Sequence, residues 1–188
     1  LLEGKSGIAP ITRFDAADFP VKIAGEVKDF DPALAGDKKT IRHMDRNAQF
    51  AVAAARMAVE DAKLDMEKEN PDMAGTVIGT GIGGIATMEE TVFRIEQKGP
   101  GKVNPFAVPM MIANMASGQV SITFGLQGPV LTDVTACASG TNAIGLAARL
   151  IKHGDADVMI AGGTEAAVAK TPMAGFAAMK ALSSRAVS

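Results

Sequence analysis

The sequence predicts an α/β fold in which buried strands alternate with helices. Three apolar, β-branched runs, at 76–80, 129–135 and 157–163, have the length and composition of buried strands. Residues 141–152 lie between the last two runs and carry alanine, leucine and isoleucine at helical spacing. Strands that alternate with helices in this way indicate a layered α/β core.

The other elements can be assigned in chain order. Near the N-terminus, 11–14 and 22–27 are expected to pair as short strands. A helix is expected from about Asp45 to Lys63, because its polar residues recur on one face and alanines cover most of the other. The later elements should be the strand 76–80, a glycine turn at 81–84, a helix over 87–97, a helix from Pro109 to about Phe124, the strand 129–135, the helix 141–152 with Gly154 as its cap, and the strand 157–163.

The only cysteine of the chain, Cys137, stands where the strand 129–135 gives way to the following helix. The unpaired N–H groups and the positive dipole end of that helix favour the thiolate, which is the reactive form of the thiol. Ser139 and Gly140 are small, so a substrate carbonyl can approach the sulfur closely, and the Cys137 N–H is a candidate oxyanion donor. The alternative is an inert, buried thiol. The flanking residues favour a nucleophile.

Composition narrows the function classes. With 188 residues, of which 47% are hydrophobic and 21% charged, the chain has the composition of a folded, soluble domain. It contains no apolar run of about twenty residues and no signal-peptide profile, so we expect neither a membrane span nor secretion. The expected location is the cytoplasm of a bacterium or, if the source is eukaryotic, an organelle lumen. A net charge of −2 and the absence of Trp and Tyr argue against nucleic-acid binding.

Metal and cofactor chemistry is not expected either. One cysteine excludes an intrachain disulfide, and His43 and His153 are not spaced to complete a zinc site with it. Gly79, Gly81 and Gly84 match the G-x-G-x-x-G form of a dinucleotide-binding turn, but no acidic residue ends a second strand about twenty positions later. We therefore interpret these glycines as close-packing residues that line a pocket, with Ile82 pointing inward.

Several segments together resemble the β-ketoacyl-[acyl carrier protein] synthases of the thiolase superfamily, and most of all the synthase II type. The nucleophile segment of that family resembles 134–145, and further agreement in order and spacing is found at 79–84, 104–109, 125–129, 154–165 and 181–185. The resemblance implies a thiolase-like α/β/α fold with a mixed five-stranded sheet. It also implies that residues 1–188 are one N-terminal synthase domain, incomplete at both ends.

The resemblance also assigns roles to individual residues. Cys137 becomes the acylated nucleophile, and its N–H becomes half of the oxyanion hole. Ile82 and Phe176 match apolar residues that line the acyl pocket, for which ordinary core packing is the alternative. Positive charge around the pocket mouth, which would meet the acidic acyl carrier protein, falls on four residues that can also be plain solvated surface charges: Lys39, Arg42, Lys102 and Lys180.

The family's two active-site histidines and its lysine have no counterpart here. In the family they come from the C-terminal half of a longer chain, whereas His43 and His153 occupy unrelated segments, the second at a helix end where it complements the dipole. The family's opening strand and its glycine turn are also missing. Both departures are explained if residues 1–188 are a fragment of a longer synthase. We expect that such a fragment can accept acyl groups at most.

The resemblance implies a condensing enzyme of fatty-acid synthesis that works as a homodimer without a metal or cofactor. The strand before Cys137 would pair across the two-fold axis, and the loop 104–109 would approach the neighbour's pocket. Three alternatives remain: a polyketide synthase ketosynthase, a thiolase that acts on coenzyme A thioesters, and a non-catalytic partner subunit. The last normally lacks the nucleophile that Cys137 supplies.

Overall fold

The computed structural model describes residues 2–184, which form two compact units, one of residues 2–31 with 167–184 and the other of residues 32–166. The first unit contains strands β1 (Ile8–Pro10) and β2 (Ile23–Gly25) and helix α7 (Lys170–Ala178). Arg185, the last residue of the 181–185 motif, lies outside the described residues.

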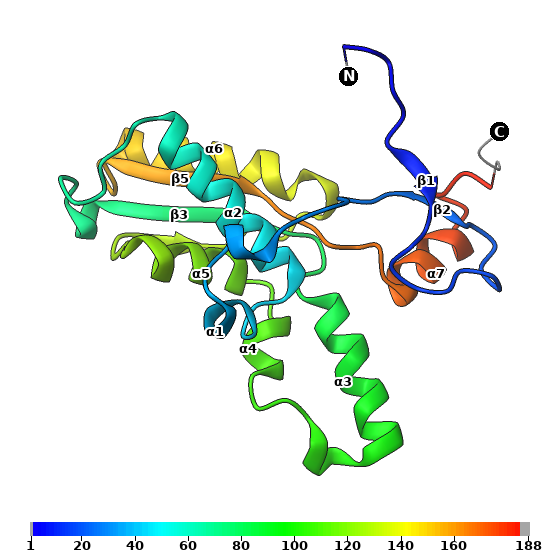
Figure 1. The fold of residues 1–188 in the computed structure, drawn as a ribbon. Coiled ribbons are helices and arrows are strands. Elements are labelled where there is room, and N and C mark those ends of the chain that lie inside the picture. Colours follow the sequence, from blue (N-terminus) through cyan, green and yellow to red (C-terminus); the bar gives the residue numbers. More distant parts are fainter. Residues whose placement is uncertain (1, 185–188) are drawn as a thin grey trace. The chain divides into compact units, whose positions relative to one another are not determined.

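The second unit contains the parallel sheet and the helices that cover it (Figure 1). Its elements, with 3-10 turns written η, are η1 (Pro32–Leu34), α1 (Lys38–Ile41), α2 (Arg46–Asp61), η2 (Pro71–Met73), β3 (Ala74–Gly79), α3 (Ile85–Lys98), η3 (Pro100–Lys102), α4 (Ala107–Met111), α5 (Met115–Phe124), β4 (Val130–Leu131), η4 (Ala136–Ala138), α6 (Ser139–His153) and β5 (Val158–Gly163).

The sheet of the second unit has the strand order β4-β3-β5, and all three strands are parallel. β3 is buried along its whole length, and its alternate residues enter two cores. Ala74 and Ile78 pack with α2 and α5 on one face, whereas Val77 packs with α6 on the other. These layers confirm the expected α/β/α architecture, and Figure 1 shows α6 along one face of the strands and α2 with α5 along the other.

The five strands do not form one mixed sheet within the described residues. β1 and β2 pair only with each other, as an antiparallel ribbon in the first unit. The N-terminal pairing was expected, but the first strand lies three residues earlier than the predicted 11–14. The reason is that the backbone N–H groups of Thr12 and Arg13 donate to the Glu26 carboxylate, at 2.9 and 3.1 Å, instead of extending the ladder.

The helix expected from Pro109 to Phe124 is divided into α4 and α5. Ile112 has an extended backbone, with φ −70° and ψ 141°. The Met111 carbonyl before it accepts a hydrogen bond from the Gly84 N–H at 3.1 Å, so the glycine turn takes the acceptor that a continuous helix would use. The donor to the Met111 carbonyl lies in a distant segment, so the residues from 109 to 124 did not indicate that the helix is divided.

The strand expected over 129–135 pairs with β3 only at Val130 and Leu131. The Ser117 side chain of α5 explains why. Its hydroxyl accepts from the Ile78 N–H at 2.9 Å and donates to the Leu131 carbonyl at 2.5 Å, so it stands between the two strands. The backbone pairing resumes beyond it, where the Thr80 N–H donates to the Asp133 carbonyl.

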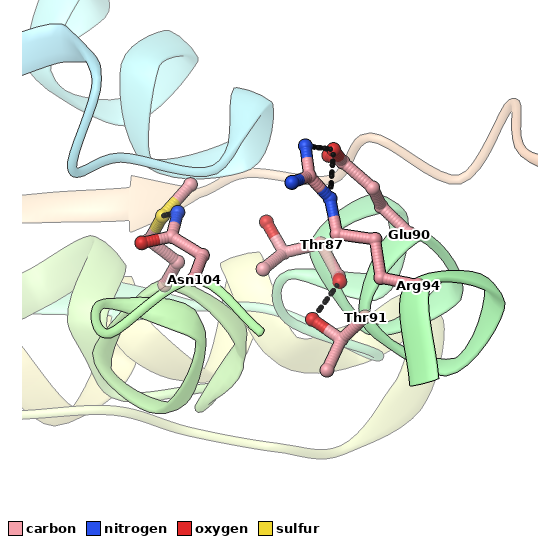
Figure 2. Close-up of polar contacts among 6 residues, drawn as sticks. Thr87, Glu90, Thr91, Arg94 and Asn104 are labelled. Carbon is pink, nitrogen blue, oxygen red and sulfur yellow. Dashed lines mark hydrogen bonds and ion pairs between the residues drawn. The ribbon is translucent and has the colours of Figure 1, made fainter. Parts of the chain in front are cut away.

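The start of α3 is fixed to the start of α2 by the buried side chain of Asp45. One carboxylate oxygen accepts from the Asn47 N–H and caps α2, and the other accepts from the N–H and the hydroxyl of Thr87, at 2.9 and 2.7 Å. Figure 2 shows the polar contacts that follow along α3, a hydrogen bond from the Thr91 hydroxyl to the Thr87 carbonyl and an ion pair between Arg94 and Glu90. Asp45 thereby links the first turns of two helices that are far apart in the sequence.

Candidate functional site

Cys137 lies in the turn η4, directly before α6, and its side chain is exposed. The strand-to-helix position is therefore confirmed, although α6 begins at Ser139, two residues earlier than the predicted start. Ala136, just before the cysteine, has a φ of 53°. A left-handed residue with a side chain costs roughly 1–2 kcal/mol, so the surrounding contacts must hold this turn.

Ser139 supplies most of those contacts. Its buried hydroxyl accepts from the Thr135 N–H at 2.9 Å and lies 2.7 Å from the Ala136 carbonyl, to which it donates. The Thr80 carbonyl at the end of β3 is 3.3 Å away. The Asn142 amide, one turn into α6, donates to the Thr135 hydroxyl at 2.8 Å. In the sequence Ser139 was noted only for its small size, whereas in the structure its hydroxyl stabilises the turn.

Close backbone contacts also seat the turn on the carboxyl ends of β3 and β5. A Cβ atom added to Gly79 would overlap the Ser139 carbonyl, and one added to Gly163 would lie 2.8 Å from the Gly140 Cα. No side chain fits in these places, and ligands of parallel sheets bind at this end of the strands. The interpretation of Gly79 as a close-packing residue is confirmed.

The glycine turn after β3 reaches the same edge. Gly83, with a φ of 72°, donates its N–H to the Thr80 hydroxyl at 3.1 Å, and a Cβ atom on Gly84 would overlap the Met110 carbonyl. Ile82 stands at the tip of this turn and is 37% exposed. Its side chain is free to meet a ligand, and its predicted place in an acyl pocket stays a prediction.

The predicted basic residues of the second unit lie on two neighbouring segments. Lys39 and Arg42 are exposed on α1 and its C-cap, and Lys102 is exposed in η3. The His43 ring stacks on Phe106 with centroids 3.8 Å apart, which brings the α1 segment beside the loop that follows Lys102. Asp37 caps α1 by accepting from the Thr40 N–H at 2.7 Å, and that backbone hydrogen bond lowers the pKa of its carboxyl.

Phe176 and Lys180 belong to the first unit. Phe176 lies on α7 and is 37% exposed, and Lys180 follows the helix with a φ of 59°. Cys137 belongs to the second unit. Their predicted roles at the pocket stay predictions.

Residues 2–184 lack two kinds of feature, a metal-binding cluster and a membrane-spanning helix. No group of three or more His, Cys, Asp or Glu side chains in this range is arranged to hold a metal ion. No helix of the described part has both the length and the apolar character needed to cross a membrane.

Sequence reasoning missed two polar residues at the carboxyl edge of the sheet. Thr80 is buried at the end of β3, and Glu165 follows β5. The Glu165 carboxylate accepts from the Thr80 hydroxyl at 3.1 Å and from the Gly81 N–H at 2.6 Å. Both residues lie in segments that resemble the synthase family, 79–84 and 154–165, but nothing in the sequence indicated that their side chains meet.

Comparison with known proteins agrees with this arrangement. Residues 1–187 match the family model described as beta-ketoacyl synthase, N-terminal domain. The chain is 52% identical over 185 residues to the 3-oxoacyl-[acyl-carrier-protein] synthase 2 of Coxiella burnetii, covering 98% of this chain and 45% of that protein. The chain thus spans about half the length of the curated relatives it matches.

Two solved structures have the same fold. The ishigamide ketosynthase/chain length factor matches with a TM-score of 0.85 and 32% identity, over 96% of this chain and 45% of its own. A type II polyketide acyl-carrier protein in complex with its ketosynthase matches with a TM-score of 0.75 and 27% identity, over 79% of this chain and 43% of its own.

Proposed function

The chain belongs to the β-ketoacyl synthase family through its N-terminal domain, and on that premise we propose that it supplies the nucleophile of a condensing enzyme of fatty-acid synthesis. In this proposal residues 1–188 form one N-terminal domain. The observation that carries the proposal is the exposed Cys137 in a left-handed turn at the carboxyl edge of the parallel sheet.

The reaction begins with attack of the Cys137 thiolate on an acyl thioester. A bond forms between the sulfur and the acyl carbonyl carbon, the original thioester bond breaks, and the carrier leaves as a thiol. The Cys137 N–H donates to the oxyanion of the tetrahedral intermediate. Ile82 and Phe176 accommodate the acyl chain.

Condensation then uses a second carrier. Malonyl-acyl carrier protein loses CO₂, the resulting carbanion attacks the carbonyl of the acyl-enzyme, and the Cys137 thiolate leaves, which gives 3-oxoacyl-acyl carrier protein. The family's two histidines and its lysine assist decarboxylation, and we assign them to a part of the protein outside residues 1–188. No metal ion or cofactor takes part in this proposal.

The partners follow from the surfaces of the chain. The proposed partner is acyl carrier protein, which is an acidic protein. Positive charge is offered to it by Lys39, Arg42, Lys102 and Lys180. The matched polyketide carrier protein in complex with its ketosynthase supports this choice of partner. A second copy of the chain is the proposed occupant of the exposed edge of β4, and we place the homodimer in the cytoplasm.

A condensation assay tests the proposal. The full-length gene product, incubated with acyl- and malonyl-acyl carrier protein, should release a 3-oxoacyl product two carbons longer than the acyl group supplied. Cys137→Ala should release none, because it removes the proposed nucleophile. Wild-type protein that forms no such product under conditions where a known synthase does would contradict the proposal.

A non-catalytic partner subunit is the alternative from another class. A cysteine-reactive inhibitor of condensing enzymes distinguishes the two, since the proposed enzyme should be modified at Cys137. A protein that stays unmodified while a known synthase reacts would favour the partner subunit.

A further inference from the structure

Thr80 joins four segments at the carboxyl edge of the sheet. It is 1% exposed, and its N–H donates to the Asp133 carbonyl at 3.1 Å. Its carbonyl faces the Ser139 hydroxyl at 3.3 Å. Its own hydroxyl accepts from the Gly83 N–H and donates to Glu165, both at 3.1 Å. One buried residue therefore contacts the segment after β4, the nucleophile turn, the glycine turn and the segment after β5.

Glu165 closes this arrangement from the side of β5. One oxygen accepts from the Thr80 hydroxyl, and the other accepts from the Gly81 N–H at 2.6 Å. A Cβ atom placed on Gly81 would lie 2.9 Å from that oxygen and 3.7 Å from the Cα and the carbonyl oxygen of Ala136. The carboxylate and the backbone before Cys137 therefore border the same point.

The glycine turn depends on such an anchor. Gly81, Gly83 and Gly84 have no side chains that could hold the turn, and glycine loses more backbone freedom on ordering than any other residue. Hydrogen bonds to an ionised acceptor are shorter and stronger than those between neutral groups. Glu165 supplies two of them to the first residues of the turn, although its own side chain is exposed and adds little to the core.

We propose that Glu165 is a positioning residue that holds the tip of the glycine turn, with Ile82, at a fixed place relative to the Cys137 turn and thereby sets selectivity among acyl chains. This inference rests on the proposed function, because Ile82 must meet the acyl chain. It assigns Glu165 no contact with the reacting atoms. Its action passes through Thr80 and Gly81.

The test compares Glu165→Ala, Glu165→Gln and the control Glu60→Ala in the full-length gene product. Glu60 is an exposed carboxylate on α2, away from the carboxyl edge of the sheet. Acylation of Cys137 by acyl thioesters of increasing length is followed by mass spectrometry, and iodoacetamide alkylation reports the intrinsic reactivity of the thiol. Amide hydrogen exchange at 81–84 reports the order of the glycine turn.

Glu165→Ala, which removes both hydrogen bonds of the carboxylate, should raise KM for long acyl chains about tenfold relative to short ones. Its alkylation rate should stay within about twofold of wild type, because the nucleophile turn keeps its own Ser139 contacts. Glu165→Gln should recover most of the selectivity, since the amide can accept from Gly81 and donate to Thr80. Glu60→Ala should behave as wild type, and exchange at 81–84 should rise only in Glu165→Ala.

An unchanged length profile in Glu165→Ala, with acylation intact, would overturn this inference and leave the proposed function standing. Equal losses for all chain lengths and for alkylation, with no recovery in Glu165→Gln, would show a purely structural role and overturn it too. Wild-type protein that forms no acyl adduct at all would overturn both the inference and the proposed function.

Discussion

β3 and β4 are neighbours in one parallel sheet, yet every residue of β3 is buried and both residues of β4 are exposed. β3 has layers on both faces and a strand at each edge. β4 lies at one edge of the sheet, and Val130, Leu131 and Val134 on and after it are 39%, 42% and 55% exposed. Apolar side chains on an unpaired edge are typical of a surface that another chain covers.

The two strands therefore hold different parts of the proposed function. The end of β3 seats the nucleophile turn by contacts between backbones, so its geometry tolerates almost no added atom. The outer edge of β4 keeps its backbone and apolar side chains available for a second copy. Substitutions at the two places should consequently fail in different ways, the first by unfolding the site and the second by separating subunits.

The largest effect on the β3 side is expected from Gly79→Ala. The added Cβ would overlap the Ser139 carbonyl, and overpacking against backbone should lower the free energy of unfolding by about 3 kcal/mol or more. Denaturant unfolding measures the loss. Gly162→Ala is the matched control, since a Cβ at this strand glycine meets no atom within 4 Å and should be tolerated. Equal stability of the two variants would contradict the seating described here.

On the β4 side, Leu131→Asp should separate the proposed dimer without unfolding the subunit. A carboxylate buried without a partner in the interface should raise the dimer dissociation constant about a hundredfold. Sedimentation velocity and circular dichroism measure the two properties. Met57→Asp, at another exposed apolar position on α2, is the control. If Leu131→Asp stays dimeric, the edge of β4 is not the interface.

Ser117→Ala tests the link between the two strands. The variant leaves the buried Ile78 N–H and the Leu131 carbonyl without their shared hydroxyl, which should cost about 2 kcal/mol in the free energy of unfolding. Ser121→Ala is the comparison on the same helix, because that hydroxyl donates to the Leu126 carbonyl but joins no strands. A loss no larger than that of Ser121→Ala would mean that Ser117 does not bridge β3 and β4.

The smallest effect is expected at the α1 cap, far from both strands in sequence. Because the pKa of Asp37 is lowered by the Thr40 backbone hydrogen bond, the cap should be complete above the ordinary aspartate value of roughly 3.9. It should be lost only as the pH falls through the lowered pKa. An NMR titration of the Thr40 amide should show this midpoint in wild type and lose it in Asp37→Asn. A midpoint at or above the ordinary value would refute the cap.

The sequence predicted the regular parts of this fold well for a physical reason. The burial of Val77, Ile78 and the alanines of α2 and α6 could be predicted because these apolar residues recur at the period of a strand or a helix. Gly154 ends α6 in the left-handed conformation expected of it. The interruptions of the predicted helix 109–124 and of the predicted strand 129–135 were not predicted. The Ser117 hydroxyl between β3 and β4, and the Gly84 N–H on the Met111 carbonyl, come from segments distant in the chain.

The residues of the candidate site also fall into those that the sequence identifies and those that only the structure shows. Cys137 was identified from its local context, because a strand, a turn of small residues and a helix are consecutive in the sequence. Glu165 could not be identified, since its partners Thr80 and Gly81 lie more than eighty residues earlier, with separations of 85 and 84. The left-handed Ala136 also left no sign, because alanine is not a residue that marks this conformation.

The most direct test of the central claim is the mass of the full-length protein after incubation with an acyl thioester. Transfer to the thiol should add the mass of the acyl group less one hydrogen, and proteolysis should locate the addition on the peptide with Cys137. The adduct should be absent from Cys137→Ala. An adduct that persists in Cys137→Ala, or that forms on another residue of the wild-type protein, would contradict the role of Cys137 as the acylated nucleophile.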